Sequence, residues 1–236
     1  MDPKHVDRHP YFDGKRLPAA QDLFVTWIDA MGIQSSMKRS PPTAANFIFK
    51  LHIAALEAPR SLKMYPVMDG IYVVARTASD TQLFLGDVLA RLADMFVCEA
   101  TPAHRFVVRA GVARGKVVHG DAIPLGVSDT LDLNPRHRDS IILGQPVINA
   151  YVVEGSAPPF GVFVHESAGE WGQHTPADPH VWAWYDERWK PLAVELRSVL
   201  DKYYDWCTTH PGEPPYDRAA IERHRKAAHD FLPLTL

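Results

Sequence analysis

The apolar residues of this chain fall into two kinds of pattern that alternate along the first hundred positions. Residues 23–29, LFVTWID, form a short, almost unbroken apolar run, which is typical of a central strand covered on both faces. Two further runs of the strand type flank Asp69-Gly70 within residues 61–76 and predict a β-hairpin. Residues 43–56 and 79–96 instead carry apolar side chains at the spacing of an amphipathic helix.

The pattern continues with further strands and helices. Residues 104–115 predict a long strand, and residues 116–120 predict a second strand that returns beside it. The order to this point is βαββαβ, which predicts a ferredoxin-like α/β sheet flanked by helices. Residues 121–140 are polar and predict a functional or mobile loop. The remaining predictions are a strand at 141–144, a helix at 145–154, a strand at 160–166, a linker at 169–180 and helices at 181–207 and 216–231.

These elements divide the chain into three expected parts. Residues 1–20 form an irregular N-terminal arm, residues 21–168 form the α/β domain, and residues 169–236 form a helical C-terminal extension. The chain has 236 residues, of which 46% are hydrophobic, so it is long enough and apolar enough to bury a real core.

Charge and cysteine content narrow the classes of function. Twenty-five Lys and Arg residues face 28 Asp and Glu residues, and this near balance argues against a broad nucleic-acid surface. Two cysteines far apart, Cys98 and Cys207, are typical of reduced thiols rather than of a disulfide framework. The polar start lacks the apolar stretch of a signal peptide, and no run reaches the length of a membrane span. We therefore expect a cytoplasmic protein that binds neither nucleic acid nor a membrane.

Two aspartates are the candidate metal ligands. Asp29 ends the first buried strand, and Asp69 lies at the tip of the hairpin. The first and third strands of a βαββαβ sheet are neighbours, so the two carboxylates can converge at one edge, where hard oxygen donors suit Mg²⁺ or Mn²⁺ bridged to phosphates. Ala30, Met31 and Gly32 form the turn after Asp29, where backbone N–H groups could bind phosphate. Taken singly, each aspartate also fits an ordinary cap or turn.

Four segments in the right order resemble the catalytic domain of class III nucleotidyl cyclases. FVTWIDAMGI at 24–33 resembles the first metal motif of that family, and YPVMDGIYVV at 65–74 resembles the second. VRAGVARGKVVHG at 108–120 is similar to the strand that follows, and ILGQPVINAYVVE at 142–154 is similar to the segment of a glycine, a helix and its terminal glutamate. The resemblance covers residues 23–166 and implies two divalent cations, Mn²⁺ or Mg²⁺, held by Asp29 and Asp69.

The chain departs from the purine-specific members of that family at four positions. Tyr65 stands where those enzymes have a base-reading lysine, and Ile141 stands where adenylyl cyclases have a base-reading aspartate. The asparagine and the transition-state arginine of the late helix fall at Ile148 and Val152. Arg109 and Arg114 are the candidates to replace that arginine, because a planar guanidinium suits phosphate oxygens. Either could also be an ordinary surface cation. Arg136 and Arg138 on the polar loop are weaker candidates.

This combination resembles the stand-alone bacterial pyrimidine cyclases of the Pycsar anti-phage system. Those enzymes also carry a tyrosine near the base, and Gly144, Ala150 and Tyr151 match their helix pattern. The resemblance implies conversion of UTP or CTP to the 3′,5′-cyclic monophosphate, a head-to-tail homodimer, and an effector that senses the product. Tyr65 would contact the pyrimidine. Two alternatives remain open: a pseudo-cyclase that binds nucleotide and regulates a partner, and an adenylyl cyclase with an unusual base pocket.

Overall fold

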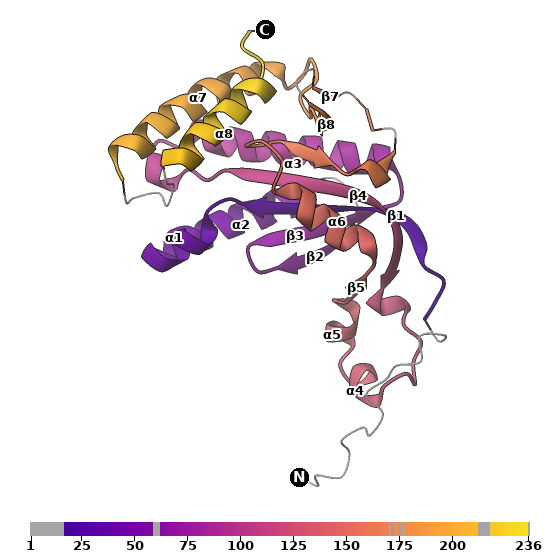
Figure 1. Cartoon of the computed structure of the whole chain (residues 1–236). Helices are drawn as coiled ribbons and strands as arrows, with labels where there is room; N and C mark the ends of the chain where they lie inside the picture. The colour runs from indigo at the N-terminus through magenta and orange to yellow at the C-terminus, as the bar shows by residue number, and fades with distance from the viewer. Residues whose placement is uncertain are drawn as a thin grey trace.

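The protein is built around an eight-stranded mixed sheet with the strand order β2-β3-β1-β4-β6-β8-β7, in which the short β5 pairs with β4 (Figure 1). The computed structural model describes residues 17–58, 62–169, 171–172, 174–175, 178–211 and 218–235. Its strands are β1 (Gln21–Ala30), β2 (Lys63–Val67), β3 (Gly70–Ala75), β4 (Val108–His119), β5 (Ile142–Leu143), β6 (Val162–Val164), β7 (His174–Thr175) and β8 (Asp178–Trp182). Its α-helices are α1 (Ile33–Arg39), α2 (Pro41–Glu57), α3 (Ala78–Cys98), α4 (Asp129–Asp132), α5 (Pro135–Asp139), α6 (Gln145–Glu154), α7 (Lys190–Thr209) and α8 (Arg218–Phe231).

The first half of the chain confirms the predicted βαββαβ arrangement. Strand β1 lies between β3 and β4 and is antiparallel to both, with Asp29 opposite Gly70 on one side and opposite Arg109 on the other. A central strand covered on both faces needs an unbroken apolar run, and residues 23–28 supply it. The mixed α/β class expected from the sequence is therefore correct.

Alternate residues of β1 enter two separate cores. Phe24 and Ile28 pack in the larger core, under α2 and α3. Val25 and Trp27 point to the opposite face and pack in a smaller core with Ala150 of α6. In Figure 1, α6 crosses one face of the sheet in front of β1 and β4, while α3 lies on the other.

Helices α7 and α8 form an outer layer beyond α3 at the top of Figure 1. The ring of Phe96 on α3 meets the ring of Tyr203 on α7 edge to face at 5.4 Å. Trp184 donates from Nε1 to the Phe160 carbonyl at 2.8 Å, which ties the segment before α7 to the sheet. The expected C-terminal helices exist, and they share one hydrophobic core with the α/β sheet.

Several predicted elements differ from the structure. Residues 116–120 do not return as a separate strand, because β4 continues without a break to His119 and pairs with β1 as far as Val117. The expected linker at 169–180 contains parts of β7 and β8, although residues 170, 173, 176 and 177 lie outside the described residues. The helix expected from residue 181 begins only at Lys190, because residues 181–182 belong to β8 and Pro191 occupies the first helical turn.

Glycine permits an unusually close approach of α6 to β4. A Cβ atom on Gly111 would lie 2.1 Å from the Ala150 carbonyl oxygen and 2.7 Å from the Glu154 nitrogen. A Cβ atom on Gly144, which precedes α6 at φ +152°, would lie 2.3 Å from the Lys116 carbonyl oxygen. Both contacts involve backbone atoms, so no side chain can move aside to make room. Helix α6 is thus fixed against the strand that carries Arg109.

None of the helices in the described ranges is both long enough and apolar enough to cross a membrane.

We predict that Gly111→Ala destabilises the protein by about 2 kcal/mol or more, because overpacking against fixed backbone forces α6 away from β4. The measurement is the free energy of unfolding from urea titration followed by circular dichroism. Gly86→Ala on α3 is the matched control, because its new Cβ would meet no atom closer than 3.8 Å. That change should be neutral or stabilising by about 0.5 to 1 kcal/mol. Equal effects of the two substitutions would contradict the prediction.

Candidate active site

Three strands bring charged side chains together where β1 ends. Asp29 is the last residue but one of β1, and Arg109 lies directly opposite it on β4. Side chains of directly opposed residues point to the same face of a sheet, so the carboxylate and the guanidinium share the face that α6 covers. The Ala30 N–H donates to the Asp29 carboxylate.

The β2–β3 hairpin carries Asp69 to the same edge. Val67 pairs with Gly70, so the two turn residues are Met68 and Asp69. The expected Asp69-Gly70 turn is therefore displaced by one residue, because Gly70 already belongs to β3. A Cβ atom on Gly70 would lie 2.3 Å from the Trp27 ring, so the glycine serves close packing on β1. Met68 adopts the left-handed conformation, with φ +49°.

Glu154 is a site residue that sequence reasoning did not select. It is the last residue of α6, its side chain is 7% exposed, and its carboxylate accepts a hydrogen bond from Arg109 Nε in an ion pair. Arg109 Nη1 also donates to the Gly155 carbonyl at 3.3 Å. The sequence offered one signal for Glu154, as the terminal glutamate of the helix in the fourth family-like segment.

The electrostatic balance of this cluster is unfavourable to the ionised form of Asp29. Burial, which is the largest cause, and the negative charges of Glu154 and Asp69 together raise the pKa of Asp29 to about 7, because Arg109 only partly opposes them. Burial also raises the pKa of Glu154, while its ion pair with Arg109 lowers it. One guanidinium is therefore shared by Asp29 and Glu154, the negative charge of Asp69 acts on both of them, and the cluster lacks positive charge.

The residues present fit a divalent cation. Carboxylate oxygens are the ligands that Mg²⁺ and Mn²⁺ prefer, and the excess of negative charge beside Asp29 would be neutralised by such an ion. Among the described residues, no three or more Asp, Glu, His or Cys side chains are grouped so that they alone could hold a metal. The remaining ligands would have to be water or substrate oxygens, as is usual for Mg²⁺.

The turn after Asp29 is formed as expected, but its amides are not all free. Ala30 ends β1, and Gly32 adopts the left-handed conformation at φ +77° immediately before α1. Met31 donates its N–H to the Val107 carbonyl at 2.7 Å, so this amide is not free to bind phosphate. The proposed phosphate contact of this turn stays a prediction.

Tyr65 lies on the same face of the sheet as Asp29, but its hydroxyl contacts a residue away from the aspartate. It stands opposite Tyr72, is 3% exposed, and its hydroxyl lies 2.5 Å from His119 Nδ1 at the far end of β4. Burial and the nearby Lys63 lower the pKa of His119, which favours the neutral ring. A base could reach Tyr65 only after neighbouring side chains moved. Its predicted role in base binding is untested.

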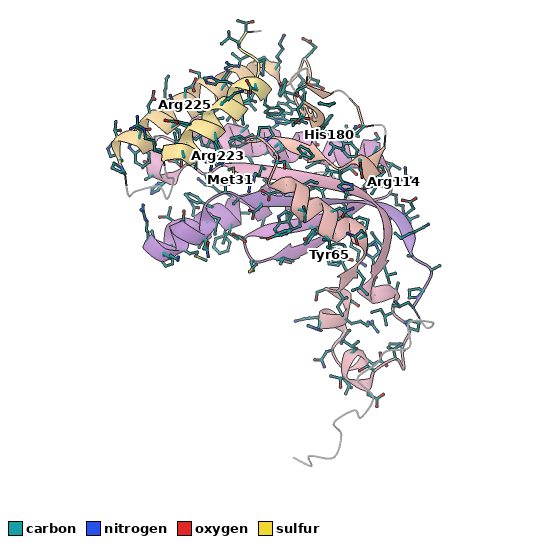
Figure 2. All side chains as sticks on the ribbon, in the orientation of Figure 1. Met31, Tyr65, Arg114, His180, Arg223 and Arg225 are labelled. Atoms are coloured by element: carbon teal, nitrogen blue, oxygen red, sulfur yellow. The ribbon has the colours of Figure 1, made fainter. Side chains whose placement is uncertain are left out.

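Arg114 does not lie beside Asp29 and Asp69. It is five positions after Arg109 on an unbroken strand, so its side chain points to the opposite face of the sheet. There its guanidinium lies over the Phe24 ring and pairs with Asp22, with Nε 3.0 Å from the carboxylate. In Figure 2, Arg114 and Met31 lie towards opposite ends of the sheet, which separates Arg114 from the turn after Asp29. Of the two arginine candidates, only Arg109 is brought to the site.

Comparison with solved structures identifies the fold. A bacterial light-regulated adenylyl cyclase superimposes with a TM-score of 0.54 at 11% sequence identity, covering 77% of this chain and all of the other (100%). The monomeric guanylyl cyclase domain of a rhodopsin fusion protein from the aquatic fungus Blastocladiella emersonii gives a TM-score of 0.49 at 14% identity, over 65% of this chain and 85% of that one. No protein-family model and no curated protein matches the sequence. The protein therefore has the fold of a nucleotidyl cyclase catalytic domain, a conclusion that rests on the bacterial structure.

We predict that the stability of the protein falls as the pH rises from about 4 to about 7, through the titration of Asp29. In this interval the folded state keeps the proton that the unfolded chain has released, because the folded pKa is about 7. Above the pKa of Asp29 in the folded state, this contribution to stability is completely lost. Asp29→Asn should remove this contribution and be more stable than the unmodified protein at pH 8 by roughly 1 to 3 kcal/mol.

The check is urea unfolding of both proteins at pH 5, 6, 7 and 8 in a chelator. The difference in the free energy of unfolding should shrink steadily towards pH 5, which serves as the internal control. A difference that does not vary with pH would show that Asp29 has an ordinary pKa in the fold.

Proposed function

We propose that the protein is a metal-dependent nucleotide cyclase that forms a 3′,5′-cyclic monophosphate and pyrophosphate from a nucleoside triphosphate. The observation that carries the proposal is the pair of carboxylates, Asp29 and Asp69, which act on each other electrostatically at the ends of neighbouring strands. The cyclase-like fold supports it, and two partly buried carboxylates that repel each other oppose folding unless a cation neutralises them.

Each residue of the cluster then has a chemical task. Asp29 and Asp69 would hold the divalent cations, which when bound polarise the ribose hydroxyl and offset the charge of the triphosphate. In the reaction, the 3′-oxygen forms a bond to the α-phosphorus, the bond from that phosphorus to the leaving pyrophosphate breaks, and the hydroxyl proton passes to solvent. Arg109, beside Asp29, would contact phosphate oxygens as charge develops on them.

The finer substrate assignment is to a pyrimidine, UTP or CTP, in anti-phage defence. Tyr65 supports it through the direction of its hydrogen bonds. When His119 carries its proton on Nε2, Nδ1 accepts the Tyr65 hydroxyl proton, and the Tyr65 oxygen keeps lone pairs that can accept from a base. A lysine at this position could only donate. The uracil N3–H and the cytosine amino group are donors of the required kind.

A homodimer is also part of the proposal. Helix α6 directs Ile148, Tyr151 and Val152 outward, and these side chains are 58%, 58% and 64% exposed. Met68 at the hairpin tip is 86% exposed. Apolar side chains around the face of the sheet that carries Asp29 are typical of a surface that a second chain covers.

A pseudo-cyclase is the second candidate, and one observation favours it. Ile148 and Val152 occupy the positions of the asparagine and arginine in the family that the sequence resembles, and neither can contact a phosphate by hydrogen bonding. Such a protein would bind a nucleoside triphosphate without converting it. An adenylyl cyclase with an unusual base pocket is the remaining alternative.

Turnover decides between these candidates. Purified protein is incubated separately with ATP, GTP, CTP and UTP in the presence of Mn²⁺, and cyclic nucleotide and pyrophosphate are quantified. We expect conversion of UTP or CTP, with Asp29→Ala and Asp69→Ala each lowering the rate at least about a hundredfold, because each removes a ligand of the reacting cations. Asp94→Ala, an exposed aspartate on α3, is the matched control and should keep full activity. Binding without turnover would favour the pseudo-cyclase, and conversion of ATP alone would favour the adenylyl cyclase.

Metal binding is predicted independently of turnover. Mn²⁺ should raise the thermal unfolding temperature, since an ion at a hundred times its Kd adds about 2.7 kcal/mol to stability. Removal of the ion with EDTA should reverse the increase. The double variant Asp29→Ala/Asp69→Ala should show no increase, whereas Asp94→Ala should respond as the unmodified protein does. A full Mn²⁺ response in the double variant would place the ion elsewhere.

A further inference from the structure

The Arg109–Glu154 ion pair is a feature of the site that metal binding by Asp29 and Asp69 leaves unexplained. The Glu154 side chain is 7% exposed and the Arg109 side chain is 23% exposed, so both partners are largely removed from water. A buried ion pair is a weak source of stability, because desolvation of the two charges offsets their attraction. Its retention next to two further carboxylates therefore calls for another physical reason.

Arg109 is held from two sides at one helix end. Nε donates to the Glu154 carboxylate, and Nη1 donates to the Gly155 carbonyl at 3.3 Å. Both acceptors come from the C-terminal end of α6, and the approach of that end to β4 depends on Gly111. Among the described residues, the structure assigns no partner to Nη2 of Arg109, so one edge of the guanidinium keeps its donors available.

An unanchored arginine at this place would form a different contact. Asp29 lies directly opposite Arg109 and its charge interacts with the guanidinium. A flexible guanidinium would pair with the Asp29 carboxylate and compete with a cation for it. With Glu154 present, the Nε side of Arg109 is occupied, and among the described residues no hydrogen bond or ion pair joins Arg109 to Asp29.

We infer that Glu154 is a positioning residue of the proposed active site, which holds the Arg109 guanidinium so that its Nη2 edge faces the transferred phosphate and leaves Asp29 to the metal. This inference rests on the proposed function. Glu154 acts through Arg109 and is not itself a metal ligand, in agreement with the absence of a three-carboxylate metal group among the described residues. A small misplacement of a phosphate-binding group slows the chemical step far more than it weakens substrate binding.

The kinetic test is a double-mutant cycle with the nucleotide that the unmodified protein converts. Glu154→Met removes the acceptor and keeps the length of the buried side chain. We expect kcat to fall at least about tenfold while KM changes less than about threefold. In the Arg109→Ala background, Glu154→Met should have no further effect, because its partner is gone. Glu57→Met, which breaks the exposed Arg91–Glu57 pair, is the matched control and should leave kcat unchanged.

A second measurement does not depend on activity. The Nε–H group of Arg109 is observed by ¹⁵N NMR in the unmodified protein, Glu154→Gln and Glu154→Met, with the assignment made from Arg109→Lys. We expect slow solvent exchange of this proton in the unmodified protein, faster exchange in Glu154→Gln, which keeps a neutral acceptor, and fastest exchange in Glu154→Met. Mn²⁺ affinity, from calorimetry, should change less than about threefold in Glu154→Met.

The outcomes separate the inference from the function on which it rests. Additive losses in the double-mutant cycle, an unchanged Nε–H exchange rate, or a loss of Mn²⁺ affinity of tenfold or more in Glu154→Met would each overturn the positioning role, the last by making Glu154 a ligand. No turnover of any nucleotide by the unmodified protein would overturn the proposed function and with it the catalytic purpose of the pair. In that case the exchange rates still decide whether Glu154 holds Arg109.

Discussion

Burying a carboxylate costs free energy unless cations or hydrogen-bond donors compensate its charge, and Asp29 is incompletely compensated. The fold places it at the end of a central strand, between the hairpin that carries Asp69 and the strand that carries Arg109. Burial and the negative charges of Glu154 and Asp69 raise the pKa of Asp29 to about 7, and the one nearby guanidinium, which pairs with Glu154, offsets this only in part. The close glycine contacts of β4 and the end of α6 bring these charges close together.

The sequence predicted the part of the site that depends on strand order. Asp29 and Asp69 interact electrostatically because β1 and β3 are neighbours, and an apolar run followed by a hairpin signal is enough to predict that pairing. Arg109 and Arg114 could be told apart from the sequence, since they are an odd number of positions apart and strand side chains alternate between the two faces of the sheet. Pro191 was a further signal in the sequence, because proline is favoured in the first turn of a helix and α7 begins beside it.

Other features could not be derived from local pattern. Glu154 looks like an ordinary helix-terminal residue, and its role depends on how closely α6 approaches β4. That approach is set by the absence of a side chain on Gly111. The sequence alone does not show which backbone a glycine in a strand will contact. The continuation of β4 to His119 is a tertiary effect too, because β1 offers pairing partners as far as Val117 and β5 pairs with Val118 and His119. Sequence pattern therefore predicted which strands meet, and packing decided which charges meet.

On the proposed function, the position of the Arg109 guanidinium explains how the site would work without an arginine on the late helix. Ile148 and Val152 make the outward face of α6 apolar, so the helix is free to meet another apolar surface. The positive charge comes instead from Arg109 on β4, a strand that pairs with β1 from Val108 to Val117 and with β6 from Ala110 to Val112. A charged group on a rigid sheet, anchored at Nε and Nη1, loses little freedom when it binds a phosphate. On the proposed function, the same helix offers an apolar outer surface to a second chain and, through Glu154 at its last turn, supports the charge on the inner one, so one short element would link association and chemistry.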